Sequence, residues 1–201
     1  MSTKFLTLSL VALLCGACHT GPKLTAADYD MNSPKMQAAW AEYMTPGPAH
    51  KVLDTKVGKW DVKVTMFNLA DGKSDTSNGT SEIAWVLDGH YLQENVTGDF
   101  GGMPFHGQGT TAYDNMLKHY TFTWIDSMGT GIMTGHGNYD AAKKMFTFES
   151  QSPDLLKGKY TASHSTETIL DRNHIKSEMW GEGPDGKQVK MMELVYTRKS
   201  S

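Results

Sequence analysis

The sequence predicts an all-β fold, an antiparallel up-and-down β-barrel of about ten strands with a short capping helix before the first strand. Two observations lead to this prediction. Runs of alternating apolar and polar residues follow one another along most of the chain, and turn-forming residues separate them. One unit also occurs twice: Gly-Thr-Thr-Ala-Tyr113-Asp114 and Gly-His-Gly-Asn-Tyr139-Asp140 are each followed by four linking residues and an aromatic run. Each unit indicates a β-hairpin.

The aromatic runs carry the clearest strand signal. Tyr120, Phe122 and Trp124 alternate with polar residues, and Phe146 and Phe148 do the same in the second run. A period of two residues is typical of a strand with one buried face. Linkers of four residues are short enough to join antiparallel neighbours, so consecutive strands are expected to pair directly.

The same criteria predict ten strands, separated by turns rich in Gly, Asp, Asn and Pro. The predicted strands are residues 58–67, 79–87, 91–99, 104–114, 119–126, 129–140, 145–150, 159–170, 174–181 and 188–198. Ten strands in an open sheet would leave two long unpaired edges, which favour aggregation. A closed barrel removes those edges.

A short helical region precedes the first strand. Ser33 is the expected N-cap and Pro34 the first helical residue of an amphipathic helix over residues 35–44. The sequence Thr-Pro-Gly-Pro at 45–48 ends this helix, and residues 50–56 are expected to form one or two further turns.

The N-terminus predicts export and lipid anchoring. Residues 1–17 contain an apolar run too short to span a bilayer, followed by small residues directly before Cys18. This arrangement resembles the lipobox of bacterial lipoproteins, with Cys15 at the position where Leu is usual, and implies acylation of Cys18 as the membrane anchor. Cys-x-x-Cys redox chemistry is the weaker alternative for Cys15 and Cys18. His19 after the cysteine favours an outer-membrane lipoprotein that faces the periplasm.

Residues 18–31 form the expected tether and residues 32–199 the single barrel domain. The chain has 201 residues and a net charge of -3, which argues against a nucleic-acid partner held by phosphate contacts. The sequence identifies no cofactor and leaves the oligomeric state open.

Two resemblances add to this interpretation. Gly58-x-Trp60 at the start of the first strand resembles the lipocalin and calycin signature, which implies that Trp60 closes the barrel floor and that Arg198 packs across its ring. A second set of motifs looks like the DUF1579 family, whose function is unknown and whose fold is a calycin-like barrel. These motifs are Pro46-Gly47-Pro48 with His50, Leu53-Asp54 to Trp60, Ser81-Glu82 through Trp85, Pro104-Phe105-x-Gly107, Tyr113-Asp114-Asn115, and Trp124 through Gly131.

A ten-stranded barrel is wide enough to leave some interior space. The expected cavity residues are Trp60, Trp85, Phe105, Tyr120, Phe122, Trp124, His136, Phe146 and Phe148. They indicate binding or carriage of a small, largely apolar molecule. The same aromatic residues could instead fill the barrel completely, which would make the protein a structural or interaction lipoprotein.

Two further alternatives depend on polar residues. Eight histidines without metal-site spacing leave a haem-binding barrel open, with His136 as the best single ligand candidate. An enzyme could use a histidine, Asp126 or Glu178, with Glu193 also in mid-strand. However, the sequence lacks a nucleophile elbow, a phosphate loop and a dinucleotide fingerprint, so an enzyme is the less favoured class.

Overall fold

The computed structural model describes residues 23–200, so the predicted signal segment and Cys18 lie outside the described residues. The chain divides into two compact units, one up to Trp40 and one from Ala41 onward. In residues 23–200, no helix is both long enough and apolar enough to cross a lipid bilayer.

The described part of the first unit contains the short 3-10 helix η1 (Ala26–Tyr29) and most of helix α1 (Pro34–Met44). The predicted N-cap is confirmed, since Ser33 Oγ accepts the backbone N–H of Met36 at 3.1 Å. Within the predicted tether, the Asp28 carboxylate accepts the backbone N–H of Thr25 at 2.7 Å. This local contact explains the turn at η1.

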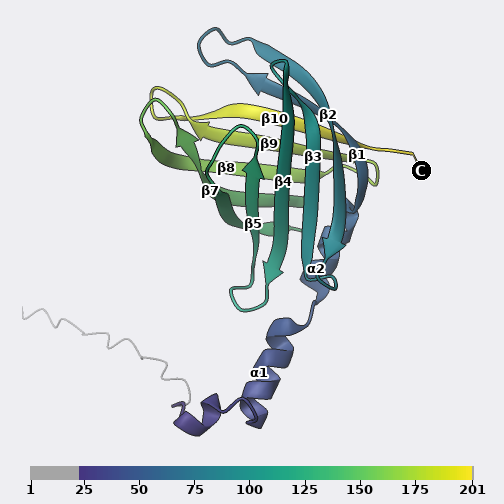
Figure 1. Cartoon of the computed structure of the whole chain (residues 1–201), viewed down its shortest axis with the longest axis vertical. Coiled ribbons are helices and arrows are strands. Elements are labelled where there is room, and N and C mark those ends of the chain that lie inside the picture. The colour runs from purple at the N-terminus through teal and green to yellow at the C-terminus, as the bar shows by residue number, and fades with distance from the viewer. Residues whose placement is uncertain (1–22, 201) are drawn as a thin grey trace, which may run out of the picture. The chain divides into compact units, whose positions relative to one another are not determined.

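The second unit is a β-barrel preceded by helix α2 (Pro48–Val52) and the 3-10 helix η2 (Leu53–Lys56). Its strands, shown in Figure 1, are β1 (Gly58–Phe67), β2 (Ser74–Val86), β3 (Tyr91–Phe100), β4 (Met103–Asp114), β5 (His119–Asp126), β6 (Met133–Asp140), β7 (Met145–Asp154), β8 (Lys159–Ile169), β9 (His174–Glu182) and β10 (Gln188–Arg198).

Every strand pairs with its sequence neighbours in antiparallel fashion, and β1 pairs with β10 to close the barrel. The closing register places Trp60 opposite Arg198 and Met66 opposite Met192. The predicted closed, up-and-down barrel is therefore confirmed. Closure leaves each strand with a partner on both sides, which removes the unpaired edges of an open sheet.

Three strands differ from their predicted bounds by more than one residue. β2 begins at Ser74 instead of residue 79, because polar residues 74–78 continue to pair with β1. β6 begins only at Met133. β7 runs through Pro153 to Asp154, where a turn was expected. The pairing of β6 with β7 ends at Ser150, so Pro153 has a paired strand on the β8 side only, and a proline without an N–H is tolerated there.

One end of the barrel is closed by α2 and η2. Leu53 of η2 and Trp60 of β1 are fully buried there, and Trp60 Nε1 donates a hydrogen bond to the Lys56 carbonyl at 2.9 Å. The buried apolar residues of the core are Leu53, Trp60, Val62, Ile83, Leu92, Tyr120, Phe146, Phe148, Ile169, Ile175 and Tyr196. Most of them lie on the strand halves nearest this closed end, so the packed core fills only part of the barrel.

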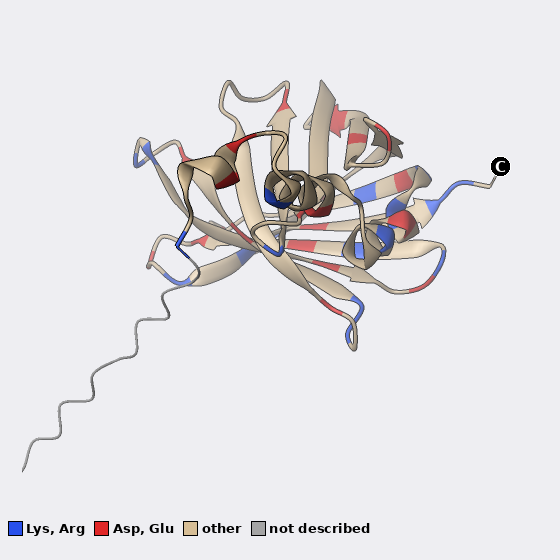
Figure 2. Cartoon of the chain, turned by 90° about the horizontal axis from the view of Figure 1, so that it is seen from below, with Lys and Arg blue, Asp and Glu red and all other residues tan. Residues whose placement is uncertain are grey.

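Charged residues are distributed over the barrel with both signs interspersed, as Figure 2 shows. This distribution agrees with the small net charge of -3.

Candidate functional site

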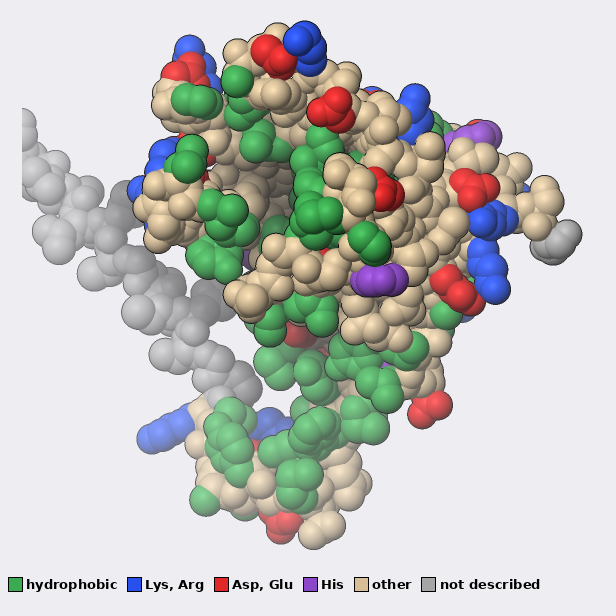
Figure 3. All heavy atoms as spheres, turned by 45° about the horizontal axis from the view of Figure 1, so that its top comes forward, with side chains coloured by type: hydrophobic (Ala, Val, Ile, Leu, Met, Phe, Trp, Pro, Cys, Tyr) green, Lys and Arg blue, Asp and Glu red, His purple; other side chains and the backbone are tan. Residues whose placement is uncertain are grey.

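A cavity of about 420 Å³ occupies the part of the barrel that α2 and η2 leave unfilled, and Lys56 of η2 lines its inner end. Its size lies within the range of about 300–1,000 Å³ that is typical of small-molecule sites. The space exists because many inward positions in this half carry small residues. These positions are Ser77, Gly79, Gly98, Gly109, Ser150, Ser165 and Ser177. Figure 3 shows the hollow at the open end, bordered by hydrophobic side chains.

The wall of the cavity is mainly apolar, and all ten strands contribute to it. Its aromatic members are Phe100, Phe105, Phe122, Trp124, Phe148 and Tyr196. Four methionines add flexible, polarisable surface: Met128, Met133, Met179 and Met192. Because methionine side chains are flexible, such a wall can adapt to apolar ligands of different shapes.

Glycines on β4 and β6 leave room for the Trp124 and Phe122 rings to pack flat against the neighbouring strands. A Cβ atom at Gly107 would collide with the Trp124 ring, and one at Gly109 would lie 3.1 Å from Trp124 Cε3. A Cβ atom at Gly135 would likewise collide with Phe122. Trp124 is held further by a hydrogen bond of 2.8 Å from its Nε1 to Asp126 Oδ2. Asp126 thus orients the indole at the outer part of the cavity.

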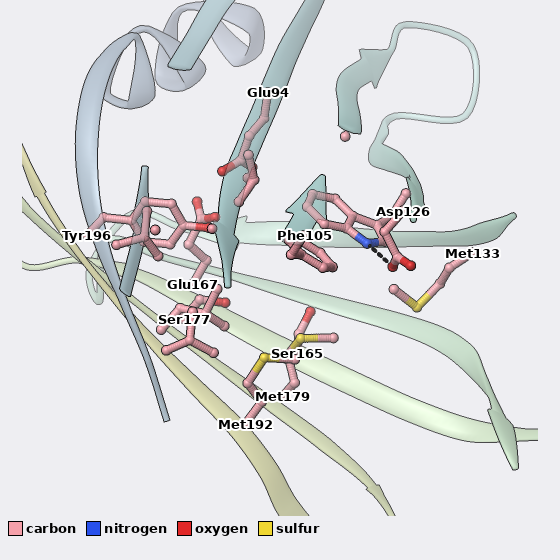
Figure 4. Close-up of a pocket in the computed structure, with 18 of the residues that line it drawn as sticks. Glu94, Phe105, Asp126, Met133, Ser165, Glu167, Ser177, Met179, Met192 and Tyr196 are labelled. Carbon is pink, nitrogen blue, oxygen red and sulfur yellow. Dashed lines mark hydrogen bonds between the residues drawn. The ribbon is translucent and has the colours of Figure 1, made fainter. Parts of the chain in front are cut away.

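The inner end of the cavity is charged. Lys56, Glu94, Glu167 and Tyr196 line it, and Figure 4 shows Glu94, Glu167 and Tyr196 grouped away from Phe105, Asp126 and Met133. Lys56 Nζ lies 3.0 Å from Glu167 Oε2. Ser81 Oγ donates to Glu94 Oε1 at 2.7 Å, and the Tyr196 hydroxyl also bonds to Glu94. The apolar cavity therefore ends in a buried ionic cluster.

The burial of this cluster perturbs its titration. Removal from water raises the pKa of Glu94, although the Lys56 charge and the Ser81 hydroxyl oppose the shift. Burial alone would lower the pKa of Lys56, but the charges of Glu167 and Glu94 raise it above the ordinary value. Burial beside the two carboxyls raises the pKa of Tyr196 well above its ordinary value. An ionised side chain at the inner end therefore costs free energy unless an opposite charge or hydrogen bonds compensate for the lost water.

One atom of the cluster has no partner. Glu167 Oε1 is buried and makes no hydrogen bond, and in the described part of the chain it is the one buried side-chain nitrogen or oxygen of which this is true. A buried acceptor without a donor costs roughly 1–3 kcal/mol. The cluster is therefore incomplete by itself.

Eight of the nine expected cavity residues divide into two groups. Phe105, Phe122, Trp124 and Phe148 line the cavity. Trp60, Trp85, Tyr120 and Phe146 point inward but belong to the closed end, where they form or pack against the core. There Trp85 Nε1 donates to Asp54 Oδ1 at 2.8 Å, and Tyr120 donates to the Ala49 carbonyl at 2.8 Å. The expectation that these four residues line a cavity is thus corrected, because α2 and η2 fill the space beside them.

His136 does not belong to the cavity. Gly135 and Gly137 of β6 face the inward residues Phe122 and Tyr120, and the alternation of the strand therefore places His136 on the outer face. Its ring lies 5.2 Å from that of His119. No histidine lines the cavity within residues 23–200, so the haem alternative loses its candidate ligand.

The candidate acids are also separated. Asp126 lines the outer part of the cavity. Glu178 and Glu193 instead pair with Lys176 and Lys190 on the outer face of β9 and β10, at distances of 2.9–3.2 Å. The residues described by the structure contain no group of three or more His, Cys, Asp or Glu arranged to hold a metal ion.

The charged inner end was not among the sites predicted from the sequence. Glu94 shares its strand face with Leu92 and Val96, and Glu167 shares one with Ile169. A carboxylate in phase with apolar residues is a signal that could have identified both. Lys56 offers no such signal, because it lies in a single helical turn.

Solved structures with a similar fold include Rv2717c from M. tuberculosis, with a TM-score of 0.58 and 13% identity over 78% of this chain and 100% of that chain. Another is the S-type phycobiliprotein lyase CPES from Guillardia theta, with a TM-score of 0.55 and 11% identity over 81% of this chain and 97% of that chain. At these identities the likeness extends to the lipocalin-like barrel fold alone. No curated protein matches the chain.

The sequence pattern of the family described as "Protein of unknown function (DUF1579)" matches residues 45–198, from the end of α1 to the last residue of β10. The match includes α2, η2 and all ten strands, and with them every residue of the cavity. The chain belongs to the DUF1579 family.

Proposed function

We propose that the protein is a lipid-anchored barrel of the bacterial cell envelope that binds or carries a small, largely apolar ligand in its cavity. The observation that supports ligand binding is the cavity of about 420 Å³ walled by aromatic and methionine side chains, and the segment before Cys18 supports the anchor. A barrel evolved only as a scaffold would gain stability by filling this space, because empty apolar volume costs free energy. The fold shared with a phycobiliprotein lyase supplies a precedent for function in this barrel shape.

Binding is tested with a neutral, apolar fluorescent dye such as N-phenyl-1-naphthylamine. The wild-type protein is expected to bind the dye with saturation, and Trp124→Ala to bind it at least about tenfold more weakly, since one aromatic wall is lost. Trp180→Ala is the matched control, because Trp180 stacks on His164 and lies outside the cavity. An equal loss of dye affinity in Trp124→Ala and Trp180→Ala would overturn the proposal. So would the absence of saturable dye binding to the wild-type protein.

Anchoring is tested separately with the full chain. Cys18→Ser is expected to move the protein from the membrane fraction to the soluble envelope fraction and to abolish incorporation of labelled fatty acid, while dye binding stays unchanged. A variant that remains in the membrane fraction would contradict an anchor at Cys18.

The native mass and visible spectrum of the purified protein separate the remaining alternatives. A retained mass without a Soret band supports an apolar ligand. A Soret band would instead establish the haem-binding barrel.

A further inference from the structure

We infer that the charged inner end of the cavity receives the head group of the ligand, and that this head group is an amine. The ligand is then an apolar molecule that ends in an ammonium group. This inference rests on the proposed function, since it concerns the same cavity.

The charges of the side chains at the inner end do not balance. Glu94 and Glu167 bring two carboxyls to the inner end, whereas Lys56 brings one ammonium group. The side chains of Lys56 and Glu167 are 8% and 15% exposed, so water screens this imbalance poorly. With both carboxyls ionised, one negative charge is in surplus. A ligand cation cancels that surplus, whereas a ligand carboxylate or phosphate would add to it.

The inner end also has fewer hydrogen-bond donors than its acceptors need. A hydroxyl has one hydrogen to donate, and those of Ser81 and Tyr196 are both used by Glu94. Lys56 lies against Glu167 Oε2, and Glu167 Oε1 is left without a donor. An ammonium group supplies three N–H donors and accepts none. The inner end thus lacks what an amine supplies.

The position of the charged cluster in the cavity also favours a ligand with one polar end. The carboxyls lie at the closed end of a cavity whose wall is formed by Phe122, Trp124 and the methionines. A ligand with its apolar body against this wall therefore carries its polar end towards Glu94 and Glu167. Burial raises the pKa of Glu94, and a cation beside it would relieve that cost.

The inference is tested by displacing the bound dye with three probes that share one alkyl chain: octylamine, octanol and octanoate, at neutral pH. Octylamine is expected to displace the dye at the lowest concentration, octanol next and octanoate last. Octanoate or octanol as effective as octylamine would overturn the inference while leaving the proposed function standing. Failure of the dye and of all three probes to bind would overturn both.

Two variants test whether the carboxylates of Glu94 and Glu167 bind the ammonium group. Glu167→Gln and Glu94→Gln each remove one carboxylate while keeping the side-chain shape. Each is expected to weaken octylamine binding by about tenfold or more, as for loss of one charged hydrogen bond, and to strengthen octanoate binding. Glu149→Gln on the outer face of β7 is the matched control.

Unchanged octylamine binding in the folded variants would overturn the inference. Should one variant fail to fold by circular dichroism, the other variant and the wild-type probe series decide.

Discussion

The guanidinium carbon of Arg198 lies 4.0 Å from the centroid of the Trp60 ring. The same side chain donates three hydrogen bonds to backbone carbonyls: to Val57 at 2.6 Å, to Thr55 at 2.9 Å and to Arg172 at 2.9 Å. Arg198 therefore joins the end of β10, the chain that enters β1 and the turn between β8 and β9. Trp60 beneath it is fully buried, so the pair closes the floor of the barrel.

Replacement of either member of this pair should destabilise the fold. Trp60→Ala is expected to lower the free energy of unfolding by about 3–5 kcal/mol, as for other buried aromatic residues. Arg198→Lys keeps the positive charge, but the lysine ammonium group lacks the planar guanidinium that donates to all three carbonyls. We expect this variant to lower the free energy of unfolding by about 1–3 kcal/mol. Chemical denaturation measures both.

Arg172→Lys is the control for Arg198→Lys, because Arg172 contributes to the floor through its backbone carbonyl. If Arg172→Lys lowered the free energy of unfolding as much as Arg198→Lys does, the role assigned to the Arg198 side chain would be refuted.

Gly107→Ala should disturb the cavity wall. The added methyl group would occupy the space of the Trp124 ring, so the ring must shift from its position in the cavity wall, at a cost of about 1–3 kcal/mol for overpacking. Dye affinity is expected to fall together with stability. Gly129→Ala is the control, since an added Cβ atom there has its nearest neighbour 4.0 Å away, at Asp126. A Gly107→Ala protein with wild-type affinity would show that the wall has room for the methyl group.

The stability of the ligand-free protein should depend on pH through Glu94. Burial raises the folded-state pKa of Glu94 above its ordinary value of 4.5. The unfolded chain therefore loses this proton first, and the folded state loses stability as the pH rises from about 4.5 through the folded-state pKa. Above both pKa values the loss is complete and constant.

Comparison with Glu94→Gln isolates this contribution. The stability of the variant relative to the wild type should rise with pH, by at most about 1.4 kcal/mol per pH unit. Denaturant titrations at several pH values between 4 and 8 measure the difference. A difference that is constant over this range would contradict a raised pKa at Glu94.

The architecture could be predicted from local patterns. The two-residue period of Tyr120, Phe122 and Trp124 defines an inward face from the strand itself, and turn residues set the ends of most strands. Ten successive strands then favour closure. The strand bounds at Ser74 and Pro153 were missed, because pairing with a neighbouring strand extends β2 and β7 beyond any local signal.

The sequence by itself determined which Phe, Tyr and Trp side chains of the strands face inward, whereas it placed His136 on the wrong face, and the tertiary structure decided how deep each inward side chain lies. Phe146 and Phe148 share a face, yet only Phe148 lines the cavity, because α2 and η2 fill the barrel beside Phe146. The charged inner end likewise joins Lys56, Glu94 and Glu167 from η2, β3 and β8. Depth and neighbourhood depend on the register of all ten strands around the closed barrel, a property that no single strand encodes.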